Sequence, residues 1–485
     1  MRGRGLAAVA AFVVGIPTLA LADAAAPQAG ATAEQPFPPS YITVEGGKAA
    51  KVDDWQDPSM CVGCHPRQAA GWQGSMHSIA FTDPVFQNLW ALGDKATKGA
   101  TFNHCGACHT GPGIASGTVK FDPDKPVHGE FTAPGVAAKG VSCDLCHTIS
   151  ASNVMKTATL EHGNASYVMS PGPVKRGPLQ ESKSPFHETA YSELHTKAAF
   201  CGNCHNIFHP TNHFPVERTY DEWKYSIYAQ NGIQCQDCHM TPVKTAIKVA
   251  DTLKPAKALG DKELGGAAGM GGPTDRSLVH EHGFVGGNAI IAPLMKVQGG
   301  EEHKAIAVER LQNAAELEVK VEQLKDNLHL LKVKVINARA GHHLPTSLTE
   351  VRQIWVEAVV TDSKGRELMR SGTLTAQNEL PADTVAFNSH AVDKDGKDTV
   401  LPWEVSRFVD SPTIPPRGYK YAKYPFNVPA DAGSLKVVAK LNYRSYPQGV
   451  ADIILGKGAV KIPTFEMESV TKEFPVSKGK VAAAK

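Results

Sequence analysis

The chain has 485 residues, and its 50 lysines and arginines nearly balance its 48 aspartates and glutamates. Because there is neither a large positive charge nor a dense basic run, composition excludes nucleic acid as a partner. The 44 glycines and 33 prolines are too few for a collagen-like fibre. At about 150 residues per domain, the length predicts two to three domains.

The N-terminus is typical of a secretory signal peptide. Two arginines precede an apolar stretch over 6–21, and Ala20-Leu21-Ala22 forms an A-x-A cleavage site. Pro17 interrupts the apolar stretch, which argues against a membrane anchor, and no later segment is apolar for long enough to span a bilayer. We therefore expect residues 1–22 to be cleaved on export, leaving a periplasmic chain with no transmembrane segment.

All ten cysteines of the chain occur in five C-x-x-C-H motifs. The motifs are Cys61/Cys64/His65, Cys105/Cys108/His109, Cys143/Cys146/His147, Cys201/Cys204/His205 and Cys235/Cys238/His239. C-x-x-C-H is the attachment signature of c-type haem, in which both thiols form thioethers and the histidine binds iron. Structural zinc would need C-x-x-C pairs in even numbers, and a thioredoxin-like motif occurs once. The sequence therefore predicts five covalently bound c-type haems.

The segments around the motifs predict a mostly α-helical or irregular haem domain over residues 60–300. Apolar spacing predicts helices at Arg67–Phe81, Glu188–Phe200 and Tyr220–Asn231. Before the first motif, residues 23–59 are rich in alanine, proline and glycine, which predicts a flexible leader. The spans between motifs are short, so we expect haems to replace much of the usual side-chain core.

The pattern changes after about residue 300. Residues 301–315 have helical apolar spacing and predict a connecting helix, and beyond it apolar residues alternate with period two. Strands are predicted at Leu317–Val321, Leu331–Val335, Val351–Thr361, Glu367–Thr373, Thr399–Phe408, Tyr419–Val428 and Leu435–Tyr446. About seven short strands without cysteine favour an all-β, immunoglobulin-like sandwich over 316–471. The Lys- and Ala-rich tail, 472–485, is predicted to be flexible.

Further histidines could supply a second axial ligand to each iron, because fifteen of the twenty lie outside the motifs. The favoured distal ligands are His77, His195 and His282, with His187 as a close alternative and His342 in a loop of the strand domain. The remaining candidates are His280, His343, His128, His162, and three that adjoin motifs and have packing near haem edges as their alternative role: His104, His209 and His213.

Several segments resemble one family of proteins. They are Trp72-Gln-Gly-Ser-Met-His77, residues 140–149, residues 222–240, the Gly- and Phe-rich context of His282, and Gly341-His-His-Leu-Pro-Thr346. The chain resembles the multihaem cytochromes that include the tetrahaem electron carrier cytochrome c-554, with hydroxylamine oxidoreductase and pentahaem nitrite reductase as more distant relatives. The resemblance covers roughly 60–345. It implies that His77, His195 and His282 are distal ligands, and that haems pack in close parallel and perpendicular pairs.

Two departures from the relatives bear on activity. Pentahaem nitrite reductase has a C-x-x-C-K motif at its catalytic haem, which this chain lacks, and hydroxylamine oxidoreductase has eight haems. We therefore favour an electron carrier with no catalytic residue, acting between periplasmic or membrane-bound redox proteins. The alternatives are a reductase of small nitrogen, sulfur or selenium oxyanions with one five-coordinate haem, and a β-domain that serves as a docking module. No oligomeric state follows from the sequence.

Overall fold

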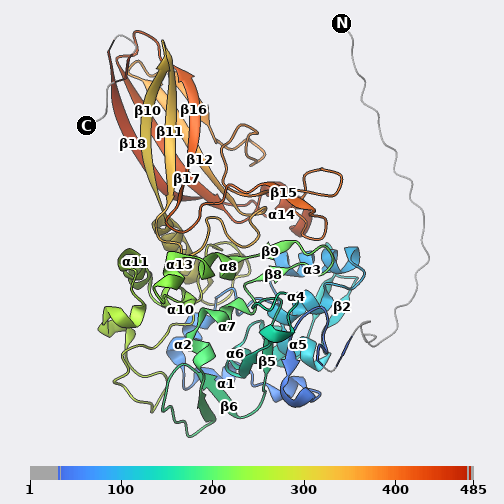
Figure 1. Cartoon of the computed structure of the whole chain (residues 1–485). Coiled ribbons are helices and arrows are strands. Elements are labelled where there is room, and N and C mark those ends of the chain that lie inside the picture. The colour runs from blue at the N-terminus through green and yellow to red at the C-terminus, as the bar shows by residue number, and fades with distance from the viewer. Residues whose placement is uncertain (1–30, 33, 478–479, 482–485) are drawn as a thin grey trace, which may run out of the picture.

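The computed structural model describes residues 31–32, 34–477 and 480–481. The predicted signal peptide, the first part of the leader and the last four residues lie outside the described residues. Figure 1 shows two halves, a lower one with the helices and an upper one with the long strands. All five C-x-x-C-H motifs lie in the lower half, which we call the motif half, and the upper one is the strand half.

The motif half consists of short elements joined by loops. Its helices are α1 (Ser59–Val62), α2 (Pro66–Trp72), α3 (Pro84–Ala96), α4 (Phe102–His109), α5 (Gly111–Ser116), α6 (Cys143–His147), α7 (Ala198–Gly202), α8 (Thr219–Lys224), α9 (Ile227–Gln230), α10 (Cys235–His239), α11 (Val243–Thr252) and α12 (Ile291–Leu294). Its strands are β1 (Thr43–Val44), β2 (Lys120–Asp122), β3 (Glu130–Thr132), β4 (Ile149–Ser152), β5 (Tyr167–Met169), β6 (Val174–Gly177), β7 (Glu188–Tyr191), β8 (Ile207–Phe208) and β9 (Pro215–Glu217). Only α3 and α11 reach ten residues, so this half has no continuous helical core.

The three predicted helices differ from the observed elements. The first ends at Trp72, before Gly74, whose positive φ of 80° suits glycine. The second is replaced by β7, a 3-10 turn and α7. The third divides into α8 and α9, because the Ser226 side chain accepts hydrogen bonds from the backbone of residues 228 and 229 and starts a new helix.

The prediction of a flexible leader over 23–59 is wrong for the second part of that segment. Ile42 and Trp55 are buried, and β1 pairs in parallel with β5. The Trp55 indole donates a hydrogen bond to the Thr148 hydroxyl at 3.2 Å. Burying two large apolar side chains orders this segment in spite of its glycines and prolines.

The strand half begins with a helix at the predicted connecting position and continues as two sheets. Its elements are α13 (Gly300–Ala314), β10 (Ala315–Lys325), β11 (Leu328–Asn337), β12 (Gln353–Asp362), β13 (Glu367–Ser371), β14 (His390–Val392), β15 (Arg407–Asp410), β16 (Tyr419–Asn427), β17 (Ser434–Arg444), α14 (Gln448–Leu455), β18 (Phe465–Ser477) and β19 (Lys480–Val481). One sheet has the order β10-β11-β16, and the other has the order β13-β12-β17-β18-β19.

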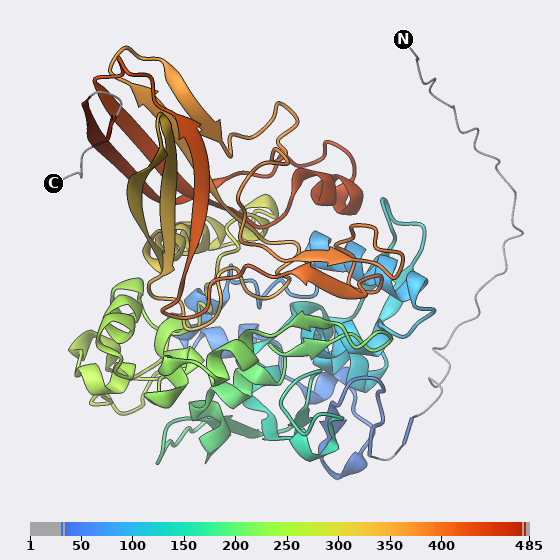
Figure 2. The ribbon, with the colours of Figure 1, turned by 45° about the horizontal axis from the view of Figure 1, so that its top comes forward.

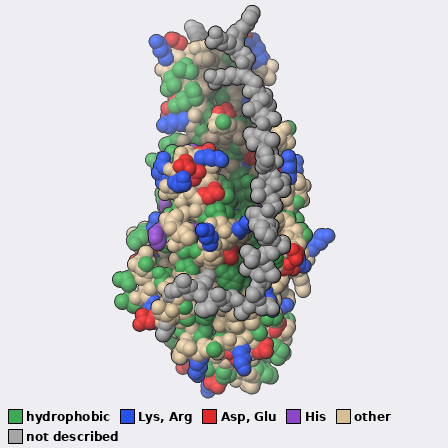
Figure 3. All heavy atoms as spheres, turned by 90° about the vertical axis from the view of Figure 1, so that its right-hand side faces the viewer, with side chains coloured by type: hydrophobic (Ala, Val, Ile, Leu, Met, Phe, Trp, Pro, Cys, Tyr) green, Lys and Arg blue, Asp and Glu red, His purple; other side chains and the backbone are tan. Residues whose placement is uncertain are grey.

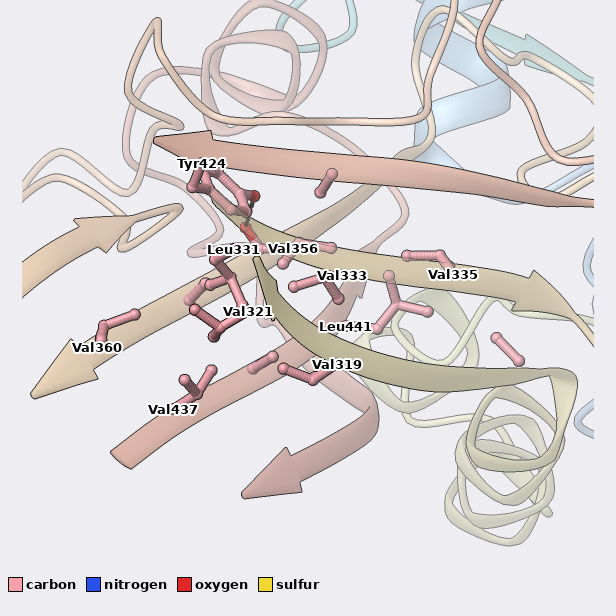
Figure 4. Packing of buried hydrophobic residues seen from close by; sticks show 14 of the residues in the cluster. Val319, Val321, Leu331, Val333, Val335, Val356, Val360, Tyr424, Val437 and Leu441 are labelled. Atoms are coloured by element: carbon pink, nitrogen blue, oxygen red, sulfur yellow. Dashed lines mark hydrogen bonds between the residues drawn. The ribbon is translucent and has the colours of Figure 1, made fainter. Parts of the chain in front are cut away.

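The two sheets face each other across an apolar core. Val333 of the first sheet and Val356 and Val437 of the second belong to one cluster of buried side chains, as Figure 4 shows. Period-two alternation places every second residue of these strands in this core. The predicted strand at 399–408 is largely wrong, since only its end joins β15, and β18 extends into the tail that was predicted to be flexible.

Two segments of the strand half, α14 and the β14–β15 hairpin, pack against the motif half (Figures 1 and 2). Helix α14 packs Val450 and Ile454 against a cluster that contains Val85 of α3. Near the β14–β15 hairpin, the Trp403 ring would lie 3.0 Å from a Cβ added to Gly93, so a glycine there permits close packing. The strand half therefore closes one side of the motif half.

Replacing Leu331 by alanine should destabilise the strand half. Leu331 has no exposed surface and packs between the two sheets, so the truncation should lower the free energy of unfolding by about 2–5 kcal/mol. Urea unfolding followed by the circular dichroism of the strands measures this change. The control is Leu324→Ala, at a leucine that is 53% exposed, for which we expect less than about 0.5 kcal/mol. Equal effects of both substitutions would contradict the observed core.

Candidate haem-binding cavity

A single cavity of about 1290 Å³ is lined by the cysteines and histidines of all five motifs. Ordinary ligand pockets measure about 300–1,000 Å³, so this cavity is larger than most. The strand half contributes His342, Arg352 and Tyr446 to its wall. The motifs lie far apart in the sequence but face one common interior.

Each motif sits on or beside a short helix that orients its side chains. Helix α6 starts at a Ser142 side chain that accepts a hydrogen bond from the backbone of Leu145, and α10 starts with a capping box between Gln234 and Asp237. In both helices the motif histidine is the last residue. The cap therefore determines where the cysteines and the histidine enter the cavity.

The five motif histidines share one hydrogen-bonding pattern. Nδ1 of His65, His109, His147 and His239 lies 2.6–2.9 Å from a backbone carbonyl oxygen, that of Ala268, Ala80, Arg176 and Val285 respectively. Nδ1 of His205 instead lies 2.8 Å from Oε1 of Glu217. An imidazole that donates from Nδ1 is held in the tautomer whose Nε2 can bind a metal. All five histidines thus fit iron ligands.

Four of the motif histidines face a second histidine at a similar spacing. The ring centroids are 6.3 Å apart for His65–His187, 6.2 Å for His205–His77, 6.3 Å for His239–His342, and 5.9 Å and 6.1 Å for His147 with His195 and His282. Two imidazoles that bind one ion from opposite sides, each at about 2 Å, have centroids about 6 Å apart. Each of the favoured distal histidines therefore lies opposite the histidine of a particular motif.

The pairing is uneven between the second and third motifs. Two histidines satisfy the spacing for His147, whereas no histidine of the described residues lies opposite His109 at this distance. The ring against His109 is that of Phe86, with centroids 3.5 Å apart and planes within 1° of parallel. The second motif is therefore the one site without a candidate distal histidine.

Burial keeps most of these imidazoles neutral. It lowers the pKa of His77, His239 and His282 to about 3 and that of His109 and His195 to about 4. His205 is different: burial opposes its charge, but the carboxylate of Glu217 raises its pKa to about 9. Neutral imidazole is the form that binds metal, so the histidines with a lowered pKa are ready to act as ligands at neutral pH, whereas His205 would release a proton on binding iron.

The motif cysteines touch one another between motifs. Cys61 raises the pKa of Cys143, Cys108 raises that of Cys204, and Cys201 raises that of Cys235, in each case mainly through a hydrogen bond between the thiols. Cys146 is also raised, first by burial and then by Cys204 and Cys201. In space, motif one therefore adjoins motif three, motif three adjoins motif four, and motif four adjoins both two and five.

The donor set fits a porphyrin better than a bare ion. Within the described ranges, no three histidine, cysteine or carboxylate side chains converge as ligands of one metal. A porphyrin supplies four nitrogens itself, so two histidines complete its iron. Nδ1 of His77 and of His195 are buried without a hydrogen-bond partner, as expected of rings whose partner is not a protein atom.

Of the candidates that adjoin motifs, His104 and His209 are both buried in the cavity wall, and their ring centroids lie 6.1 Å apart, although neither belongs to a motif. One feature of the cavity wall was missed from the sequence. Glu217 was not considered, because nothing in its local sequence indicates the contact with His205. The β8–β9 hairpin creates that contact by pairing Glu217 with Ile207, two residues after the histidine.

Residues 60–148 match the family described as cytochrome c554 and c-prime. The structure resembles a penta-heme cytochrome c552 from Thermochromatium tepidum, with a TM-score of 0.56 and 16% identity over 88% of this chain and 100% of that one. MtrC from Shewanella baltica OS185 aligns over 39% of this chain and 28% of its own, with 10% identity and a TM-score of 0.20. No curated protein matches by sequence. The family match over 60–148, together with the five C-x-x-C-H motifs, supports a multihaem c-type cytochrome.

Among the described residues, no helix combines the length and apolar character needed to cross a membrane.

Replacing His342 by alanine should change one haem and leave the others intact. Its ring is 6.3 Å from that of His239, so its loss should convert one low-spin signal in the electron paramagnetic resonance (EPR) spectrum into a high-spin signal. The control is His390→Ala, at a half-exposed histidine that lies near Asp398 and outside the cavity wall. An unchanged spectrum of the His342 variant would remove His342 from the ligands.

Proposed function

We propose that the protein is an exported pentahaem c-type cytochrome that carries electrons between periplasmic redox partners. The observation that supports it most strongly is the repeated pairing of a motif histidine with a second histidine at 5.9–6.3 Å. Two-histidine coordination suits electron transfer, because it leaves no open position for a substrate. The haem itself would supply outer-sphere electron transfer between porphyrin edges.

Each haem would be held by two cysteines and the histidine of one motif. The proposed distal ligands are His187 for the first motif, His77 for the fourth and His342 for the fifth, with His195 or His282 for the third. The contacts between motif cysteines give the relay a branched order, in which the fourth motif is the junction.

The remaining predictions concern domains, location and partners. We propose a pentahaem domain over 60–300 and an immunoglobulin-like domain over 316–471, since β10-β11-β16 and β12-β17-β18 follow the A-B-E and C-F-G orders of that fold. Cleavage after residue 22 would deliver the chain to the periplasm, where soluble or membrane-bound redox proteins would be its partners. On the face in Figure 3, acidic and basic side chains are interspersed, which suits short-lived contacts with such partners rather than nucleic acid.

The unpaired His109 supports a second candidate function. With Phe86 against its ring and no histidine opposite within the described residues, His109 would leave one face of its haem free. A small nitrogen, sulfur or selenium oxyanion could be reduced there while the other four sites deliver electrons. Arg352 also lines the cavity, where it donates to the Ser445 carbonyl oxygen and lies over the Tyr446 ring. Glu217 offsets part of its charge, and the rest could attract an anion.

EPR of the oxidised, haem-loaded protein distinguishes the two functions. We expect five haems per chain by the pyridine haemochrome assay, with low-spin signals from the four paired sites. A high-spin signal that shifts on adding nitrite or sulfite, and that disappears in the Cys105→Ala/Cys108→Ala variant, would establish the reductase at the second motif. Five low-spin haems whose signals do not change on adding either anion would exclude the reductase and leave electron transfer as the function. Fewer than five haems per chain would contradict both.

A further inference from the structure

The fourth motif has a hydrogen-bond acceptor unlike those of the other four. His205 Nδ1 lies 2.8 Å from the Glu217 carboxylate, whereas the other motif histidines donate to neutral backbone carbonyls. The Glu217 side chain is only 15% exposed. A carboxylate draws the Nδ1 proton more strongly than a carbonyl does, which makes the imidazole a stronger electron donor at Nε2.

Strand pairing fixes the backbone of Glu217, and a second hydrogen bond besides that of His205 holds its carboxylate. Antiparallel pairing of β8 with β9 sets Glu217 opposite Ile207. The Thr219 hydroxyl donates to the same oxygen at 3.3 Å, and it lies 2.8 Å from the Thr346 hydroxyl in the loop that carries His342. Thr346 donates in turn to Glu222 at 2.6 Å. Strand pairing and the Thr219 hydrogen bond therefore fix the Glu217 carboxylate in the position where it contacts His205.

From this geometry we infer that Glu217 lowers the reduction potential of the haem at the fourth motif. The inference rests on the proposed function, in which His205 and His77 are the axial ligands of that haem. A stronger electron donor stabilises ferric iron over ferrous iron, and the buried negative charge acts in the same direction. Glu217 is a positioning residue, since it acts through His205.

The position of the fourth motif gives this tuning a consequence. Its cysteines adjoin those of motifs two and five directly, and Cys146 of motif three is nearby. A lower potential at this junction favours its oxidised form, so an electron that reaches it is passed on to a neighbouring haem more readily than it would be with a neutral acceptor at His205.

A spectroelectrochemical titration of the haem-loaded Glu217→Gln variant tests the inference. Glutamine keeps an acceptor oxygen but removes the charge. We expect one of the five midpoints to rise by about 59 mV, which corresponds to an about tenfold change in the equilibrium constant of a one-electron couple. The midpoint at the second motif should rise by less, because the Glu217 charge also acts on His109 but makes no hydrogen bond to it. The other three midpoints should stay in place, and Glu217→Asp, which retains the charge, should stay near the parent protein.

The matched control is Asp221→Asn, because Asp221 lies four residues away and binds Asn206 and Arg218 but no motif histidine. Five unmoved midpoints in Glu217→Gln would overturn the inference, as would equal shifts in Asp221→Asn or in Glu217→Asp. These outcomes differ from failure of the proposed function, which would appear in the parent protein as fewer than five haems. A folding defect would appear as lost haem in the variant, and Thr219→Val, which loosens Glu217 without removing it, should then give a smaller rise of the same midpoint.

Discussion

Every site in this protein depends on an imidazole with one nitrogen held by the protein and the other facing the cavity. The acceptor of Nδ1 is supplied by a distant segment: Ala268 for His65, Arg176 for His147 and Val285 for His239. Each of these bonds fixes a tautomer and also ties a loop to a motif. Loops that look irregular in the motif half are therefore constrained by the same contacts that prepare the histidines for a metal.

The same contacts explain how a half with short helices can be ordered. Without a continuous apolar core, its stability must come from clusters such as that around Trp90 and Phe131 and from whatever fills the cavity. Bound haems would bring large apolar surfaces into contact with the walls, and a group that binds only the folded state stabilises it. The strand half adds a wall and places His342 opposite His239, so it contributes to a site as well as covering it.

The sequence predicts local features of this protein better than distant ones. The C-x-x-C-H motifs are five-residue patterns, and the alternation of β10 to β12 reflects burial on one side of each strand, so both can be read locally. The leader was misjudged because its apolar residues are few and follow neither a helical nor a strand period for long, and the burial of Ile42 and Trp55 depends on β5 and Thr148, more than ninety residues away. The helix predicted at 188–200 failed for a similar reason, since β7 depends on pairing with β6.

The pairing of histidines could be predicted from the sequence only in part. His77, His187, His195, His282 and His342 could all be named as candidates, but their partners follow from the fold: His77 faces His205, which is 128 residues later, and not the first motif that it follows in sequence. Glu217 shows the limit most clearly, because a glutamate in a short hairpin has no local signal of a contact with a motif histidine. In the proposed relay, the place where electrons rest would therefore depend on residues that no motif contains, and the acceptor at Nδ1 is the feature to compare among multihaem proteins.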